Sequence, residues 1–197
     1  QALFGYTTFD AVQFFDTIRL NSANDKARIP LMRYRLYQYV IAINHFKDEL
    51  FLCENRMAGL DSDSGLIESV LKSKDVPVYP FKTVNSETSN MQDADYIEMV
   101  KKGIASCYRG DVFQIVLSRR YQQSFIGDEM NVYRALRSIN PSPYLFFFDY
   151  GDYKLMGSSP EAQLIIQNGK AVVHPIAGTF KRTGDEAIDA QKAAELL

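Results

Sequence analysis

The 197-residue sequence has no tryptophan, only two cysteines, and almost no excess of charge of either sign. Its net charge of −2 provides no basic surface for nucleic acid or for an anionic membrane. Cys53 and Cys107 lie far apart and lack the spacing of metal ligands. We therefore expect two reduced, partly buried thiols in a cytoplasmic protein, with neither nucleic acid nor a membrane as partner.

Long hydrophobic runs are also missing. The densest run, from Tyr144 to Phe148, has the length of a strand, so neither a transmembrane helix nor a signal peptide is predicted. The sequence starts at Gln1, and a predicted helix over Ala187–Leu197 stops without a cap or a polar tail. These features favour an internal fragment that is truncated at both ends.

Hydrophobic periodicity predicts helices and antiparallel hairpins in an order typical of an α+β fold. Helices are predicted over Phe9–Leu20, from the Asp61–Ser64 caps to about Lys72, and over Ala94–Tyr108, Glu129–Ser138 and Ala187–Leu197. Strands are predicted over Tyr34–Asn44, Leu50–Glu54, Val112–Gln122, Tyr144–Tyr150, Tyr153–Met156, Ala162–Gln167 and Lys170–Val173. The stretch Val76–Asn90 is predicted to be extended or loop. The Asn168-Gly169 pair predicts a tight hairpin turn.

Three places carry residues that could take part in chemistry. Gln114 stands in a predicted strand, where an ordinary polar residue on a half-solvated face is also expected. Glu161 follows a predicted strand, either as a general acid with a pKa raised by burial or as a solvated loop carboxylate. Gly178 and Thr179 could offer backbone N–H groups and a hydroxyl to an anion. The sequence contains no Walker A loop, G-x-S-x-G or H-E-x-x-H motif.

Short motifs stand in register along the chain. They are Gly5-Tyr6, Gly110-Asp111-x-x-Gln114-x-Val116-x-Ser118, Asn140-Pro141-Ser142-Pro143-Tyr144, Ser158-Ser159-Pro160-Glu161 and Pro175-Ile176-Ala177-Gly178-Thr179. In this order they resemble the anthranilate synthase large subunits among the chorismate-utilising enzymes. The resemblance implies part of a four-layer α/β/β/α sandwich with two orthogonally packed antiparallel sheets. Residues 1–90 would form a regulatory-side portion, and residues 91–197 would begin the chorismate-binding catalytic region.

Within the resembled family, two positions separate one reaction from another. Where Gln114 stands, the enzymes that add water carry a lysine as general base, because water must lose a proton as it attacks. Where Ala177 stands, the aminodeoxychorismate synthases carry a lysine that attacks the ring covalently. Gln114 and Ala177 can do neither. The pair therefore implies direct addition of ammonia, as in anthranilate synthase or, alternatively, aminodeoxyisochorismate synthase.

The resemblance also implies a role for each candidate residue. Glu161 corresponds to the general acid that protonates the departing C4 hydroxyl group, and Gln114 belongs to the same catalytic set. The substrate-binding residues would be Ala177, Gly178 and Thr179. The allosteric tryptophan site would be Asn140, Pro141, Ser142, Pro143, Tyr144 and Leu145, the last an apolar replacement for the methionine of many relatives.

Cofactor and partners follow from the same resemblance. Mg²⁺ is expected in the parent enzyme, with its ligands beyond Leu197, so no metal ligand is assigned within this sequence. Chorismate is the expected substrate, ammonia is expected from a glutamine amidotransferase subunit or domain, and tryptophan is the expected inhibitor. Half of a sandwich would expose apolar surface, which favours a homo-oligomer. A fragment of this length is expected to be inactive alone, and a non-catalytic binding fragment is the alternative.

Overall fold

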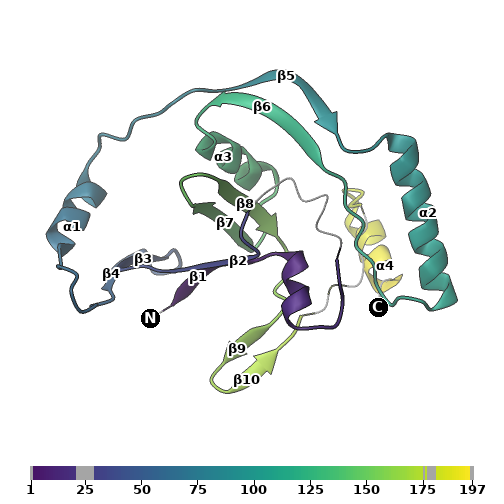
Figure 1. Cartoon of the computed structure of the whole chain (residues 1–197), viewed down its shortest axis with the longest axis horizontal. Coiled ribbons are helices and arrows are strands. Elements are labelled where there is room, and N and C mark those ends of the chain that lie inside the picture. The colour runs from purple at the N-terminus through teal and green to yellow at the C-terminus, as the bar shows by residue number, and fades with distance from the viewer. Residues whose placement is uncertain (1, 21–28, 175, 177–180, 196–197) are drawn as a thin grey trace. The chain divides into compact units, whose positions relative to one another are not determined.

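The computed structural model describes residues 2–20, 29–174, 176 and 181–195 (Figure 1). The chain divides into two compact units, Gln1–Pro77 and Val78–Leu197. Within the described residues, the strands pair into antiparallel two-stranded sheets. Helices combined with antiparallel hairpins confirm the α+β class. The four-layer arrangement and the division into regulatory and catalytic portions stay predictions.

The first unit is built from two strand pairs, a short 3-10 helix and one α-helix. Its elements are β1 (Leu3–Thr7), η1 (Phe9–Phe14), β2 (Met32–Leu36), β3 (Tyr39–Asn44), β4 (Glu49–Glu54) and α1 (Ser64–Lys72). β1 pairs with β2, and β3 pairs with β4 across the turn at residues 45–48. The Asp63 carboxylate accepts the Leu66 N–H at 2.9 Å and caps α1, as the sequence predicts.

Two predictions in the first unit were wrong. The helix expected over Phe9–Leu20 is a 3-10 helix that ends at Phe14. Asp16 accepts the backbone N–H of Thr17 at 2.6 Å, and such a local bond competes with continued helix. The single strand expected over Tyr34–Asn44 is two strands with different partners, β2 and β3. Alternation gives the direction of side chains but not the strand that lies alongside.

The second unit contains the remaining elements. They are β5 (Phe81–Ser89), α2 (Asp93–Arg109), β6 (Tyr121–Gly127), α3 (Met130–Ile139), β7 (Tyr144–Asp149), β8 (Lys154–Ser159), β9 (Ile165–Gln167), β10 (Lys170–Val172) and α4 (Glu186–Glu195). The four helices predicted from Asp61 onward are therefore confirmed to within a few residues. α2 ends at Gly110, whose φ of 80° is the left-handed conformation that glycine adopts at low cost.

The strand predicted over Val112–Gln122 is the main error in the second unit. The strand is β6, which begins at Tyr121 and pairs with β5. Residues 113–120 lie outside any strand or helix, since none of the described residues supplies them with a pairing partner. β5 itself was expected to be extended or loop, because its Ser, Thr and Asn content and the preceding prolines are unlike a typical strand. Its ladder is interrupted between Val84 and Thr88.

The hairpin β7–β8 packs against α3 (Figure 1). The rings of Tyr133 in α3 and Phe147 in β7 lie 5.5 Å apart. Tyr150 follows β7, is only 5% exposed, and contacts the rings of Phe148 and Tyr153. The β9–β10 hairpin turns at Asn168 and Gly169, with φ of 52° and 72°, which confirms the predicted tight turn.

Few apolar side chains are fully buried in the described part of the chain. Ala11 and Tyr150 are the buried apolar residues, whereas Phe113, Tyr108 and Phe46 are almost completely exposed. Both cysteines are free and exposed, so the expectation of partly buried thiols was wrong. A two-stranded sheet leaves at least one face open, and Cys53 lies on such a sheet in β4.

Candidate functional site

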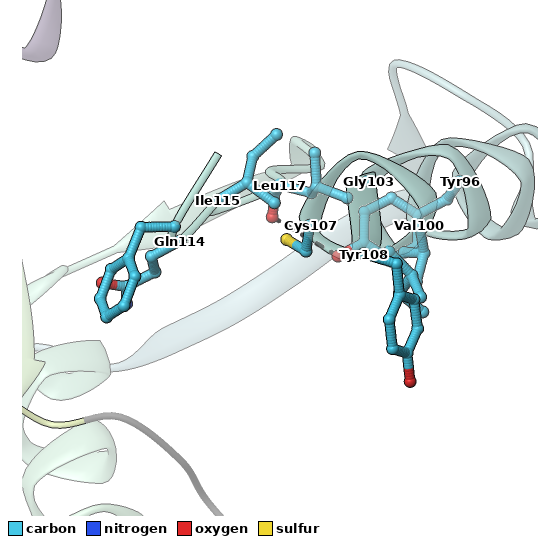
Figure 2. A pocket seen from close by; sticks show the side chains of 10 residues that line it. Tyr96, Val100, Gly103, Cys107, Tyr108, Gln114, Ile115 and Leu117 are labelled. Atoms are coloured by element: carbon cyan, nitrogen blue, oxygen red, sulfur yellow. Dashed lines mark hydrogen bonds between the residues drawn. The ribbon is translucent and has the colours of Figure 1, made fainter. Parts of the chain in front are cut away.

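Gln114 lines an open cavity of about 650 Å³ between α2 and the irregular segment 113–117 (Figure 2). The walls are mostly apolar or aromatic. The lining residues are Tyr96, Val100, Gly103, Ile104, Cys107 and Tyr108 of α2, with Phe113, Gln114, Ile115 and Leu117 of the segment. A single amide side chain in such surroundings provides a neutral hydrogen-bonding group rather than a base.

Gly103 lets the segment approach α2 closely. It is the buried residue of this helix, and a Cβ atom there would lie 3.2 Å from Leu117 Cδ1 and 3.6 Å from Ile115 Cγ2. A glycine inside a helix costs about 1 kcal/mol relative to alanine. That cost is accepted here because the two side chains occupy the space of a methyl group. The Tyr96 hydroxyl adds a long hydrogen bond, 3.5 Å, to the Leu117 carbonyl oxygen.

Glu161 stands just after β8, at the end of the Ser158-Ser159-Pro160 sequence. Its backbone N–H donates to the Ser159 hydroxyl at 3.2 Å, which bends the chain away from the strand. The side chain of Glu161 is exposed among the described residues. The burial that would prepare it as a general acid is therefore not supplied here, and Glu161 does not line the cavity around Gln114.

The predicted regulatory segment, residues 140–145, runs from the end of α3 into β7. The carbonyl oxygen of Asn140 accepts the Ser158 hydroxyl at 2.6 Å and the Ser142 N–H at 2.9 Å. Antiparallel pairing then sets Tyr144 opposite Ser159, and Leu145 opposite Ser158. The structure thus brings the predicted regulatory segment next to the strand that leads to Glu161. Sequence patterns alone gave no sign of this contact.

An ion pair joins α3 to the same hairpin. Lys154 Nζ contacts Glu129 Oε1 and lies 3.8 Å from Asp149 Oδ2. The hydrogen bond from Lys154 is the main cause that lowers the pKa of Glu129, and the same bond raises the pKa of Lys154. Both groups are therefore charged over a wide pH range, and they hold the first turn of α3 against β8.

The predicted substrate-binding residues cannot be placed, because Ala177, Gly178 and Thr179 lie outside the described residues.

The described residues also show no metal site and no membrane-spanning helix. The two histidines, His45 and His174, are both exposed. Within residues 2–20, 29–174, 176 and 181–195, no group of three or more His, Cys, Asp or Glu side chains could hold a metal ion. No helix in this part of the chain is long and apolar enough to span a membrane.

Among known protein families, the one described as "chorismate binding enzyme" matches this chain over residues 1–197. Anthranilate synthase component 1 of Aquifex aeolicus is 30% identical over 212 residues, which are 99% of this chain and 42% of the relative. The corresponding protein of Bacillus subtilis is 36% identical over 139 residues, covering 67% of this chain and 27% of the relative. The chain thus spans less than half the length of these curated relatives.

A solved structure agrees with these matches. The crystal structure of anthranilate synthase component I from Streptococcus pneumoniae superimposes with a TM-score of 0.72 and 26% sequence identity. The superposition covers 98% of this chain and 44% of that one. Because the family match extends over all 197 residues, the chain belongs to the chorismate-binding enzyme family.

Proposed function

We propose that this chain is part of an anthranilate synthase large subunit, which converts chorismate and ammonia to anthranilate, pyruvate and water. The observation that carries the proposal is the similarity to anthranilate synthase component 1 proteins, at 30% identity over nearly the whole chain. The chain spans 42% of those relatives, so the activity is proposed for the longer protein that contains it.

The residue types at two positions support addition of ammonia rather than water. Gln114 has no basic atom, and its cavity walls are mainly apolar and aromatic. Ammonia is already a neutral nucleophile and requires less help from a base than water does. Ala177 has no nucleophilic atom, which favours direct attack over a covalent intermediate.

The proposed reaction balances in two steps. First, the nitrogen bonds to the ring carbon ortho to the carboxylate-bearing carbon and loses a proton, the ring double bonds shift, the C4–O bond breaks, and the hydroxyl leaves as water with a proton from Glu161. Second, that ortho carbon loses a proton, the bond between the ring carbon and the ether oxygen breaks, and the enolpyruvyl methylene carbon takes up a proton, which releases pyruvate and leaves the aromatic ring. A positioned acid contributes roughly 10²- to 10⁴-fold to such a step.

Mg²⁺ bound in such an enzyme would neutralise charge on the chorismate carboxylate. From the resemblance to the family, we assign its ligands to the part of the protein beyond Leu197. We further propose ammonia supply by a glutamine-hydrolysing subunit or domain, inhibition by tryptophan at residues 140–145, and a cytoplasmic location. A homo-oligomer stays part of the proposal.

Anthranilate fluorescence tests the proposal directly. The full-length protein, given chorismate, ammonium and Mg²⁺, should produce anthranilate, whereas the 197-residue chain alone should not. Glu161→Gln in the full-length protein should lower kcat by at least 10²-fold while KM for chorismate changes little. Glu87→Gln, a change of an exposed carboxylate in β5, is the matched control. Equal turnover in the two variants would reduce Glu161 to a loop carboxylate.

Aminodeoxyisochorismate synthesis is the second candidate, because Gln114 and Ala177 fit both amine-adding reactions. That product keeps the enolpyruvyl ether, whereas anthranilate has lost it. Product mass therefore separates the two activities in the same assay. If neither product forms, calorimetric titration with chorismate and with tryptophan tests the remaining alternative, a non-catalytic binding module.

A further inference from the structure

The cavity around Gln114 depends on how segment 113–120 lies along α2. The described residues of this chain supply no β-ladder to this segment, so within them its position rests on side-chain contacts and on the backbone hydrogen bonds of Arg120. Leu117 and Ile115 rest over Gly103, near the middle of the helix. Packing of aliphatic side chains is not directional, and a shift of the segment along α2 would still leave both in contact with the helix. A directional contact is therefore needed to fix the position of the segment along α2.

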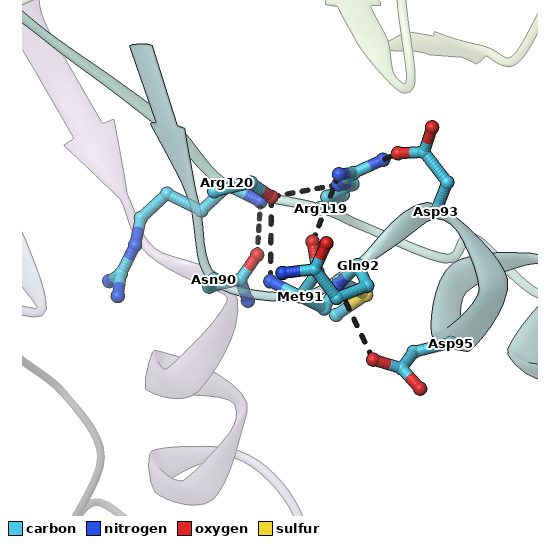
Figure 3. A network of polar contacts seen from close by, with 8 residues as sticks. Asn90, Met91, Gln92, Asp93, Asp95, Arg119 and Arg120 are labelled. Atoms are coloured by element: carbon cyan, nitrogen blue, oxygen red, sulfur yellow. Dashed lines mark hydrogen bonds and ion pairs between the residues drawn. The ribbon is translucent and has the colours of Figure 1, made fainter. Parts of the chain in front are cut away.

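Arg119 supplies directional contacts at the far end of the segment (Figure 3). Its guanidinium donates from Nη1 to Asp93 Oδ1 at 2.7 Å, from Nε to Ser89 Oγ at 2.8 Å, and from Nη2 to the Met91 carbonyl oxygen at 2.9 Å. Its Cζ atom also lies 4.7 Å from the centre of the Tyr121 ring. These contacts tie one side chain to the end of β5, the start of α2 and the start of β6.

Arg119 makes these side-chain contacts, whereas the side chain of the neighbouring Arg120 does not take part in them. The Arg119 side chain is 15% exposed, although its partner Asp93 is 87% exposed. Arg120 contributes through its backbone, which exchanges hydrogen bonds with Asn90 at 2.9 Å and 3.1 Å. The side chain of Arg120 is exposed and extends away from Arg119 and Asp93 (Figure 3). A change of its side chain therefore leaves these contacts in place.

We propose that Arg119 is a positioning residue for Gln114. They are five positions apart, a reach of at most about 18 Å, and Arg119 does not line the cavity that Gln114 lines. Arg119 acts through the segment: its guanidinium group holds one end of the segment at the start of α2, Leu117 packs on Gly103, and Gln114 then lines the cavity. Lysine cannot reproduce three diverging donors from a planar group. The inference rests on the proposed function of Gln114 in ammonia addition.

Kinetics of the full-length protein test this role. Arg119→Lys should lower kcat/KM for ammonia by about 10-fold or more and leave KM for chorismate nearly unchanged, since only the position of Gln114 is disturbed. Arg120→Lys is the matched control and should behave as the wild type. Asp93→Asn removes the charge of one partner and should give a smaller loss in the same direction. Equal kinetics for Arg119→Lys and Arg120→Lys would overturn the proposal.

A double-mutant cycle separates positioning from general damage. If Arg119 acts through Gln114, Arg119→Lys should have almost no further effect in a Gln114→Ala background. Additive losses would contradict the proposal, while a large effect of Gln114→Ala alone would leave the role of Gln114 intact.

Hydrogen exchange provides a readout that does not depend on activity. In Arg119→Lys, the backbone amides of Asn90 and Arg120, which donate to the Arg120 carbonyl oxygen and to Asn90 Oδ1, should exchange at least 10-fold faster than in Arg120→Lys. If the wild-type protein makes no anthranilate, the proposed function fails, and this comparison still decides whether Arg119 fixes the segment. Unchanged exchange would rule out the positioning role.

Discussion

The hydroxyl group of Ser158 in β8 donates a 2.6 Å hydrogen bond to the backbone carbonyl oxygen of Asn140 at the end of α3. Asn140 begins the segment predicted to bind tryptophan, and Ser158 lies three residues before Glu161. The bond therefore joins a predicted regulatory segment to the strand that carries the predicted general acid. A change in the position of either segment would be passed to the other through this contact.

Ser158→Ala should weaken inhibition by tryptophan in the full-length protein. Loss of one neutral hydrogen bond corresponds to about 1 kcal/mol, or roughly a 5-fold higher inhibition constant. Inhibition constants measured from anthranilate formation check this. Ser138→Ala is the control, because Ser138 donates only to the carbonyl oxygen of Arg134 within α3. An inhibition constant equal to that of the control would show that the bond has no part in regulation.

The Glu129–Lys154 ion pair should make stability depend on pH at both extremes. The pKa of Glu129 is lowered in the folded state, so its contribution is present above the ordinary value of 4.5 and is lost as pH falls through the folded pKa. The pKa of Lys154 is raised, so its contribution is present below 10.5 and is lost as pH rises through the folded pKa.

Glu129→Gln should therefore lower the urea midpoint at pH 7 and flatten its fall toward acid pH. Glu98→Gln serves as control, because Glu98 pairs with Lys101 on the open surface of α2, where both side chains are at least 60% exposed. If the two variants lose stability equally at pH 7, the Glu129–Lys154 pair is no more than an ordinary surface pair.

Gly103→Ala should not give the stabilisation that helix propensity predicts. Alanine is favoured over glycine in a helix by up to about 1 kcal/mol, but its methyl group would lie 3.2 Å from Leu117 Cδ1. Pushing Leu117 away should cancel the gain. Gly65→Ala in α1 meets no atom closer than 3.8 Å and should stabilise the protein. If Gly103→Ala and Gly65→Ala raise the midpoint of urea unfolding equally, the segment does not pack closely on Gly103.

The sequence by itself determined the four α-helices from Asp61 onward, the tight turn at Asn168-Gly169 and the family. Caps such as Asp63 and Gly110 act over a few residues, so their effect can be predicted from local spacing. The chemistry proposed for Gln114 and Glu161 also comes from the sequence, because a residue type limits the reactions open to it.

Tertiary structure alone decided which segments pair and what surrounds each candidate residue. Alternation could not indicate that residues 34–44 change partner, or that residues 113–117 lie along α2 with no strand partner among the described residues. The contacts of Arg119 with Asp93 and of Ser158 with Asn140 join residues 26 and 18 positions apart. Side chains so far apart in the sequence come into contact only when the backbone between them has folded. Local residue spacing therefore cannot predict these contacts.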